Sequence, residues 1–346
     1  MKRIGVAVFF GGTSSEHEIS LLSAQNIIKN LDPEKYDLLK IGISKSGEFF
    51  LFEKDFCKNA DDPTAIALAD DGKKIFLEKI ADKIEVAFPI LHGGSGENGE
   101  IQGFFRILKI PFVGPDAEAS AICFDKEITK IVLKNSGFPV ADGEVLRRDE
   151  KYNLRKIAEK WGFPLFVKPA RAGSSVGVFR VKTINELQKA VEKAFFHDSK
   201  ILIEVAIVGR ETECAILGNA GAIKSSEVAE IVPQKGYEFY DFDAKYTDDD
   251  GAKIIAPAKL TATERKTIQN TAKKAAAILG IEGMSRVDGF LKKNGEWIIN
   301  EINTIPGFTN ISMYPKLWEL SGLSQGKLID ELLILAMKRD QKEKKR

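Results

Sequence analysis

The order of apolar and polar residues predicts alternating strands and helices in the first third of the chain. Residues 3–10 form an apolar run of the kind that is buried in a parallel sheet. Apolar residues between 21 and 31 recur at helical spacing, and Ser15 with Glu18 forms a capping-box pattern just before them. Further strands are expected at about 37–43 and 84–91. This alternation favours an open α/β sheet, whose ligands gather beyond the carboxyl ends of the strands.

The chain beyond Gly114-Pro115, which we interpret as a joint between domains, again mixes helices and strands. Helices are predicted at 119–123, 126–135, 153–161, 184–196, 261–279 and around 327–337, with a Thr-x-x-Glu start at Thr261 and Glu264, and strands at 162–169, 178–181, 201–205 and 212–217.

One long segment, residues 232–256, has no core periodicity but carries five aromatic residues. Long loops without secondary structure in compact domains are usually functional lids or disordered segments, and the aromatic content favours a lid. We therefore expect this segment to close over a binding site.

Residues 284–303 are two short apolar runs joined by Asn294-Gly295. An Asn-Gly pair between such runs predicts a hairpin with a type I′ turn, because that turn needs positive φ at both central residues. Side chains of directly paired residues share a face of the sheet. The predicted pairs are Lys293 with Glu296, Asp288 with Glu301, and Arg286 with Asn303, and the last four side chains share one face.

Directly opposed carboxylates repel one another unless a cation lies between them. Asp288, Glu301 and the amide of Asn303 form a hard-oxygen ligand set suited to Mg²⁺, which proteins often hold with one or two carboxylates and substrate phosphates. Arg286 beside them suits developing negative charge. The alternative is a surface hairpin with solvated charges, which the pairing alone leaves open.

Other stretches carry phosphate-binding chemistry. Lys168 ends a predicted strand, and the loop 173–177, rich in glycine and serine, follows it, so the two form a flap that can cover phosphates with backbone N–H groups and hydroxyls. It is not a P-loop, because no Gly-Lys-Ser/Thr opens a helix here. Gly11-Gly12-Thr13 lacks the Gly-x-Gly-x-x-Gly spacing, which disfavours a dinucleotide-binding dehydrogenase.

Each of these residues also has a structural interpretation on local evidence. Glu16 can simply stabilise the helix dipole, His92 can be a satisfied loop histidine, and the flap can be a flexible hairpin with an exposed lysine. Glu204 and Glu211 can be exposed charges at strand ends, although the apolar end of such a strand also suits an adenine, with an acid reaching the ribose.

Composition narrows the class of protein. The formal net charge is +1 in 346 residues, so nothing suggests a nucleic-acid or membrane partner. The three cysteines are far apart and show no Cys-x-x-Cys spacing, which predicts neither a zinc site nor a disulfide framework and fits a reducing cytoplasm. No apolar run approaches the roughly 18 residues of a membrane helix. We expect a cytoplasmic protein.

Taken together, these motifs resemble those of the ATP-grasp carboxylate-amine ligases and, more closely, the D-alanine-D-alanine ligase family. The resemblance rests on Lys168 with its flap, on Arg286-Val287-Asp288 and on the runs 11–20, 92–93, 239–246 and 300–307, in the family's order along the whole chain. It implies an N-terminal open α/β sheet domain at 1–117, followed by a two-lobed ATP-grasp fold (α+β). Its central lobe is expected at 118–206, and its C-terminal lobe at 207–346, with the lid at 233–256.

The resemblance also implies ATP-dependent ligation of two D-alanines through a D-alanyl phosphate, for peptidoglycan synthesis. Two Mg²⁺ or Mn²⁺ ions are expected on Asp288, Glu301 and Asn303. The residues implied for the nucleotide are Lys126, Lys168, Ser174, Ser175, Glu204, Ala206, Ile207, Glu211, Asn300 and Glu301.

The same resemblance assigns the amino-acid substrates. Glu16 is expected to bind the first D-alanine's ammonium in a network with Ser174 and Tyr246, and His92 to lie nearby. Ser312 and Lys245 match positions that contact the second substrate's carboxylate and the phosphate. Arg286 and the Gly307 N–H are expected to stabilise the oxyanion of the tetrahedral intermediate.

Acceptor choice depends on the lid. Lys245-Tyr246 matches D-alanine-adding relatives, whereas D-lactate-adding relatives use a histidine-bearing loop, and this loop has no histidine. Ala172 and Ile305 depart from the family's usual residues. The alternatives are a D-alanine-D-lactate or D-alanine-D-serine ligase and, from another class, a non-catalytic nucleotide-binding regulatory protein. The resemblance suggests a homodimer formed through the N-terminal domain.

Overall fold

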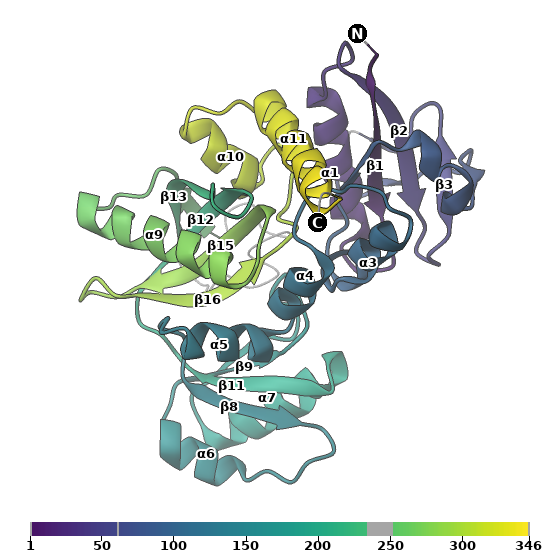
Figure 1. Ribbon diagram of the computed structural model, residues 1–346. Helices are drawn as coiled ribbons and strands as arrows, with labels where there is room; N and C mark the ends of the chain where they lie inside the picture. Colours follow the sequence, from purple (N-terminus) through teal and green to yellow (C-terminus); the bar gives the residue numbers. More distant parts are fainter. Residues whose placement is uncertain (1, 61, 234–251, 345–346) are drawn as a thin grey trace.

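The computed structural model describes residues 2–60, 62–233 and 252–344. Within these residues, three sheets of four or five strands are each accompanied by helices (Figure 1). The N-terminal sheet has the order β6-β3-β2-β1-β7, in which β1 is parallel to β2 and β7. The predicted open α/β sheet is confirmed, with antiparallel strands added at one edge. The elements of this part of the chain are β1 (Ile4–Gly11), α1 (His17–Asn30), β2 (Tyr36–Ile43), β3 (Phe49–Phe52), β4 (Cys57–Lys58), β5 (Ala67–Leu68), β6 (Lys73–Lys74), β7 (Val86–Pro89), α2 (Gly94–Glu97) and α3 (Glu100–Ile107), with 3-10 turns at Leu77–Lys79 and Ala81–Lys83. Of these, β4 and β5 pair with each other in a separate two-stranded sheet.

The central part of the chain forms a four-stranded antiparallel sheet of order β10-β9-β11-β8. The helix predicted at 126–135 is confirmed as α5 with the same bounds, and the Asp125 side chain caps it by accepting from two backbone N–H groups. The elements are α4 (Ala117–Phe124), α5 (Lys126–Asn135), β8 (Gly143–Arg147), α6 (Leu154–Trp161), β9 (Leu165–Pro169), β10 (Phe179–Val181), α7 (Ile184–His197) and β11 (Lys200–Val205).

The C-terminal sheet has the order β14-β13-β12-β15-β16 and is antiparallel throughout. The capping box predicted at Thr261 and Glu264 is confirmed, since each side chain accepts from the other residue's backbone N–H. The elements are β12 (Arg210–Gly218), β13 (Lys224–Pro233), β14 (Ala252–Ile255), α9 (Ala262–Ile278), β15 (Gly283–Leu291), β16 (Trp297–Asn303), α10 (Met313–Leu320) and α11 (Gln325–Glu343).

The sequence predictions for the start of α1 and for the segment 232–256 are wrong. The predicted capping box of Ser15 and Glu18 does not form: α1 begins at His17 without a side-chain cap, and Glu18 instead pairs with Lys45 at 2.7 Å. The segment 232–256 is not without structure at its ends, because β13 extends to Pro233 and β14 pairs with it. A short edge strand held by backbone pairing needs no apolar periodicity, so the sequence pattern did not reveal β14.

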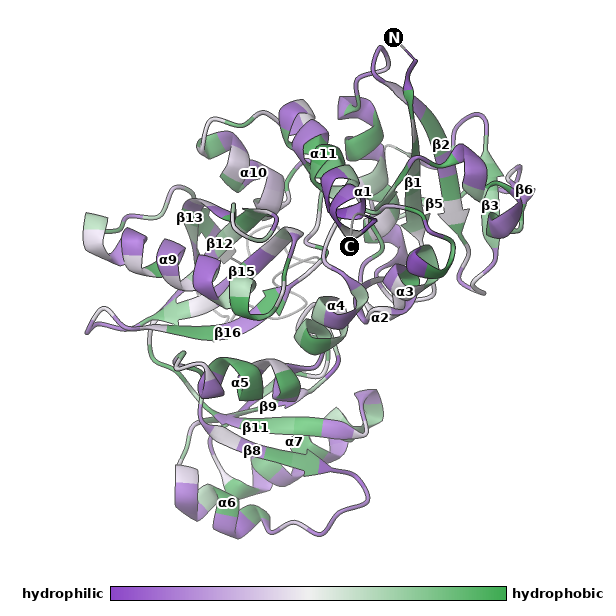
Figure 2. Ribbon diagram, in the orientation of Figure 1, coloured by the Kyte–Doolittle hydropathy of each residue, from purple (hydrophilic) through white to green (hydrophobic). Residues whose placement is uncertain are grey.

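The hydrophobic cores join parts of the chain that are distant in sequence. One core contains Val6 and Phe88 of the N-terminal sheet together with Leu328 and Leu332 of α11, and Figure 1 shows α11 beside α1. The central sheet and α7 have a core of their own. In Figure 2 hydrophobic colour is concentrated in strands such as β11, while α6 is largely hydrophilic. The N-terminal sheet and α11 are therefore packed as a unit, and the proposed domain limits remain a prediction.

Arg339 of α11 strengthens this packing at the joint after the N-terminal sheet. Its guanidinium is buried and donates to the carbonyl oxygens of Gly114 and Phe112, both at 2.7 Å, and it lies over the Phe112 ring. No helix among the described residues is long and apolar enough to span a membrane.

Candidate active site

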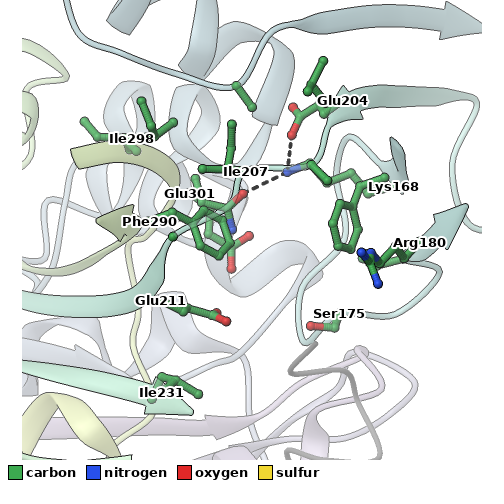
Figure 3. A pocket seen from close by; sticks show the side chains of 18 of the residues that line it. Lys168, Ser175, Arg180, Glu204, Ile207, Glu211, Ile231, Phe290, Ile298 and Glu301 are labelled. Atoms are coloured by element: carbon green, nitrogen blue, oxygen red, sulfur yellow. Dashed lines mark hydrogen bonds and ion pairs between the residues drawn. The ribbon is translucent and has the colours of Figure 1, made fainter. Parts of the chain in front are cut away.

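A pocket of about 460 Å³ lies between the central and C-terminal sheets (Figure 3). Its walls are largely apolar with charged side chains among them, which is the usual composition of a small-molecule site. Nine of the ten residues predicted for the nucleotide line it, and the tenth, Ser174, lies beside it in the flap. The apolar lining includes Phe166, Ile207, Ile231, Phe290 and Ile298.

Lys168, on β9, points into this pocket (Figure 3). Its ammonium lies 2.8 Å from Glu204 Oε2 and donates to Asn300 Oδ1 at 3.1 Å. The pairing follows from the sheet, because β11 neighbours β9 and carries Glu204. Both lysine and glutamate are buried, so the lysine head is fixed in position before any ligand arrives.

Lys130 completes this buried cluster and was not predicted from the sequence. It lies one turn after Lys126 on α5, so both side chains face the same way, and its ammonium pairs with Glu204 Oε1. Burial lowers the pKa of Lys130 to about 8; the Glu204 carboxylate opposes this shift, and the nearby ammonium groups of Lys168 and Lys126 add to it. The cluster therefore has an excess of positive charge that suits a polyphosphate.

Lys126 connects the flap to the hairpin. Its ammonium donates to the Ala172 carbonyl oxygen at 2.6 Å and lies 3.5 Å from Glu301 Oε2. Ser174 and Ser175 at the tip of the flap have φ of 50° and 58°, a left-handed conformation that costs non-glycine residues energy. Such strain gathers at binding sites, which is consistent with a flap that presents its groups to a ligand.

The hairpin of β15 and β16 has Arg286 opposite Asn303 and Asp288 opposite Glu301, as predicted. The predicted turn is wrong. Gly295 has φ of 84°, but Asn294 has no positive φ, and Lys292, not Lys293, pairs with Glu296. The loop therefore has three residues and not two.

A β-bulge corrects the register before the functional residues. Asp288 pairs with Glu301 but Gly289 pairs with Ile299, so Asn300 is the extra residue on β16. The one-residue shift at the turn and the opposite shift at the bulge cancel. The bulged Asn300 is the residue that contacts Lys168, so the irregularity places a polar group in the pocket.

The oxygen set of this hairpin fits a divalent cation. Asn303 Oδ1 is buried without a hydrogen-bond partner, whereas such atoms in folded proteins are almost always paired. Among the described residues, no cluster of three or more histidine, cysteine, aspartate or glutamate side chains is arranged to hold a metal ion. The set proposed here contains only two carboxylates, and its third ligand is the amide oxygen of Asn303. Carboxylate and amide oxygens are the ligands that Mg²⁺ and Mn²⁺ take.

Arg286 is held by acidic residues on the same face. Its Nε and Nη2 donate to the two oxygens of Asp288 at 2.8 and 2.7 Å, and its Nε lies 3.3 Å from Glu213 Oε2. Although burial opposes the charge, Asp288 and Glu213 raise the pKa of Arg286 well above its usual value. The arginine is therefore cationic at every working pH. Glu213 was not predicted from the sequence.

A second group of predicted residues meets where the N-terminal sheet faces the flap. Ser174 donates a hydrogen bond to Glu16 Oε1. Gly93 and Gly173 both approach the Glu16 carboxylate, and a Cβ on Gly93 would lie only 2.8 Å from Glu16 Oε2. Burial and the nearby Glu16 raise the pKa of Glu97 to about 8. The raised pKa favours a neutral Glu97, so Glu16 is the carboxylate of this pair that suits a substrate ammonium.

His92 is buried with both ring nitrogens engaged, by the Ser23 hydroxyl at 3.0 Å and the Ile305 carbonyl oxygen at 3.1 Å. Burial lowers the pKa of His92, which keeps the ring neutral. The Ser23 hydroxyl in turn accepts from the Phe308 N–H at 3.2 Å. His92 thus fixes the loop that carries Gly307.

Of the remaining residues predicted for the site, some lie among the described residues and two do not. Ser312 accepts from the Thr309 N–H at 3.0 Å and is close to Gly307, where a Cβ would lie 2.9 Å from its hydroxyl. Ala206 and Glu211 line the pocket, and the Ala206 N–H donates to the Pro164 carbonyl oxygen at 3.2 Å. Lys245 and Tyr246 lie outside the described residues, as does most of the predicted lid.

The fold and the site together define the class of protein: two lobes, a glycine-serine flap and a carboxylate-bearing hairpin enclose one nucleotide-sized pocket, and this is the ATP-grasp fold. Comparison with known families gives the particular group. The models for the N-terminus and the C-terminus of D-ala D-ala ligase match residues 5–115 and 132–334. The chain belongs to the D-alanine-D-alanine ligase family.

Individual relatives agree over nearly the full length. A D-alanine-D-alanine ligase of Shouchella clausii is 46% identical and covers 99% of this chain and 96% of its own. The crystal structure of the VanG D-Ala:D-Ser ligase of Enterococcus faecalis matches with a TM-score of 0.83 at 36% identity, covering 97% and 100%. A Bacillus anthracis D-alanine-D-alanine ligase complexed with ATP matches with a TM-score of 0.78 at 27% identity, covering 98% and 99%.

Proposed function

We propose that this protein joins two D-alanines to D-alanyl-D-alanine for peptidoglycan synthesis, converting ATP to ADP and phosphate. The observation that carries the proposal is the face of the β15-β16 hairpin, where Arg286, Asp288, Glu301 and Asn303 lie beside the lysine-lined end of a nucleotide-sized pocket. A protein that only bound nucleotide would not need an arginine held between two buried carboxylates. The full-length similarity to ligases supports the same conclusion.

In this proposal the nucleotide occupies the 460 Å³ pocket. The purine lies against the apolar wall near Ile207, and Glu211 accepts from the ribose. Lys126 and Lys168 bind phosphates, and the N–H groups and hydroxyls of Ser174 and Ser175 cover them. Glu204 has both oxygens occupied by lysines, so it acts by fixing Lys168.

Asp288, Glu301 and Asn303 would hold two Mg²⁺ or Mn²⁺ ions, which supply neutralisation of phosphate charge during in-line transfer. The hairpin's own residues do the rest. Glu301 faces Lys126, so the hairpin and the flap are linked through one ion pair. Arg286 stays charged and lies on the same face as the ligands, where negative charge develops.

The two amino-acid substrates bind beside Glu16, where the N-terminal sheet faces the flap. Glu16, steadied by Ser174 and by Tyr246, receives the ammonium of the first D-alanine. The carboxylate of that D-alanine attacks the γ-phosphate of ATP, which forms an acylphosphate and releases ADP. The amine of the second D-alanine then attacks the acyl carbon. Arg286 and the Gly307 N–H stabilise the resulting oxyanion, and phosphate leaves. Ser312 and Lys245 hold the second carboxylate and the phosphate.

One assay tests this function. Purified protein with Mg-ATP and D-alanine is expected to release phosphate and form the dipeptide in equal amounts, whereas L-alanine gives neither. If phosphate release does not depend on D-alanine, the proposed function is wrong.

Acceptor choice has a specific alternative, because VanG, a D-Ala:D-Ser ligase, is 36% identical to this chain. Mixtures of D-alanine with D-serine or with D-lactate decide it by the product formed. The Lys245-Tyr246 pair leads us to expect D-alanyl-D-alanine as the main product in both mixtures. A homodimer and a cytoplasmic location, both expected from the family, complete the proposal.

Lys130 gives a prediction of its own. Replacing Lys130 with methionine is expected to weaken Mg-ADP binding about 10- to 100-fold, since a hydrogen bond to a charged group contributes roughly 1.5–3 kcal/mol. Lys130 is cationic below its pKa of about 8 and loses its charge as the pH rises. Mg-ADP binding by the unmodified protein should therefore weaken above that pH, whereas Mg-ADP binding by Lys130→Met should not show this pH dependence. Calorimetric titration at several pH values measures both effects.

Two further variants control this experiment. Lys134→Met changes an exposed lysine one turn along the same helix, whose partner is Asp142 at 2.8 Å, and should bind Mg-ADP normally. Lys130→Arg keeps the charge and should retain most of the affinity. Equal affinity in Lys130→Met and Lys134→Met would contradict a role for Lys130 in the nucleotide site.

A further inference from the structure

Three carboxylates form a row across three neighbouring strands of the C-terminal sheet. Glu213 of β12 pairs directly with Asp288 of β15, and Asp288 pairs directly with Glu301 of β16. Directly paired side chains lie on the same face, and like charges in that arrangement are destabilising. Glu213 and Asp288 are each only 6% exposed, so water does not relieve the repulsion. The row needs cations on this face.

Arg286 supplies one of them. It lies two residues before Asp288 on β15, opposite the small Ala215 of β12, which leaves space for the guanidinium over the strand. Its Nε and Nη2 donate hydrogen bonds to Asp288, and Nε is also 3.3 Å from Glu213 Oε2. Arg286 is therefore held between two carboxylates on adjacent strands.

Only one of these carboxylates is a proposed metal ligand. Both oxygens of Asp288 accept from Arg286, so a divalent cation on Asp288 shares the carboxylate with Arg286 and weakens that pairing. Glu213 has no such conflict, because it lies on the far side of Asp288 from Glu301 and Asn303. Its contact with Arg286 Nε can persist when Asp288 is coordinated.

We propose that Glu213 is a positioning residue that anchors Arg286 through Nε when Asp288 binds metal, leaving the two Nη groups for the oxyanion. This inference rests on the proposed function and adds a residue to it. A central strand is a suitable place for such an anchor, because β12 is paired on both sides, with β13 and β15, and cannot shift easily. Without Glu213, Arg286 has Asp288 as its carboxylate partner and competes with the metal for it.

The test combines kinetics with a measurement that needs no turnover. Glu213→Gln is expected to lower kcat about 10- to 100-fold, as is typical when an outer partner of a metal site is lost, with KM for ATP within about twofold. The concentration of Mn²⁺ that half-saturates the ADP complex, measured by titration without D-alanine, should rise several-fold. Glu213→Asp keeps the charge and should recover part of both losses.

Two comparisons separate positioning from general structural support. Glu296→Gln removes an exposed glutamate at the tip of the hairpin, which pairs with nearby Lys292 and Asn294, and should match the unmodified protein. In an Arg286→Ala background, Glu213→Gln should cause no further loss of kcat, because a positioning residue acts through Arg286.

The inference is overturned by unchanged Mn²⁺ half-saturation in Glu213→Gln, or by a further loss of kcat when it is added to Arg286→Ala. The Mn²⁺ titration keeps these outcomes separate from the proposed function. If the unmodified protein does not form the dipeptide, the proposed function is refuted. Mn²⁺ binding by the ADP complex still reports whether Glu213 reduces the competition between Arg286 and the metal for Asp288.

Discussion

Replacing Arg286 with alanine is expected to lower turnover about 100- to 1000-fold while Mg-ADP binding is retained. That loss is typical when one preorganised donor to an oxyanion is removed. Arg286 suits this role because it is permanently charged, buried and already aligned by Asp288 and Glu213. The nucleotide pocket is not lined by Arg286, so binding should be spared. Steady-state kinetics and calorimetric titration with Mg-ADP measure the two quantities.

Arg286→Lys is the conservative companion variant. Lysine keeps the positive charge between the carboxylates but loses the planar fork, so it should fold normally and still lose most of the turnover. The half-saturating Mn²⁺ concentration should fall in Arg286→Ala, because Asp288 no longer pairs with a cation. Turnover within tenfold of the unmodified protein in both variants would show that another group stabilises the oxyanion.

Much of the fold followed from sequence patterns that act locally. Thr261 and Glu264 predicted the start of α9, since both halves of a capping box lie within four residues. Ser15 and Glu18 have the same pattern but form no capping box, because Glu18 pairs with Lys45 in the loop between β2 and β3. A local pattern is therefore reliable only where no distant charge competes for its side chains.

The hairpin shows why a correct pairing can follow from a wrong turn. Trp297, Ile298 and Ile299 are all buried, so this strand has no polar-apolar alternation from which its register could be read. The prediction relied on the Asn-Gly pair alone, and it placed Asp288 opposite Glu301 only because the longer turn and the bulge at Asn300 cancel. Bulges near active sites aim side chains, and the sequence carries no simple mark of them.

The residues missed at the site are charges whose meaning comes from distant partners. In the sequence, Lys130 is one of several lysines on α5. Its role becomes visible only in the fold, where it pairs with Glu204 of β11. Glu213 lies two residues after Glu211 on β12, and this spacing is typical of the polar face of an exposed strand. Only the sheet order, with β12 in the centre, shows that a charge there must be compensated.

Replacing Glu301 with glutamine is the second change with a large expected effect. Glu301 is the only residue of the proposed set that both faces the metal site and contacts Lys126, at 3.5 Å. A glutamine keeps the shape but removes a negative charge from the ligand set, and metal ions supply several kcal/mol of transition-state stabilisation. At fixed Mg²⁺, kcat/KM for ATP should fall by about 100-fold or more, since 1.4 kcal/mol corresponds to tenfold.

The metal dependence identifies the cause of this loss. If Glu301 is a ligand, raising Mg²⁺ or substituting Mn²⁺ should restore part of the activity of Glu301→Gln, and the half-saturating concentration should increase at least tenfold. Glu296→Gln, on the same hairpin but outside the ligand set, should keep the normal metal dependence. Asn303→Leu should shift the metal dependence in the same direction as Glu301→Gln, because it removes the buried oxygen that has no protein partner. An unchanged metal requirement in both variants would mean that the hairpin binds phosphate through Arg286 without holding the cation.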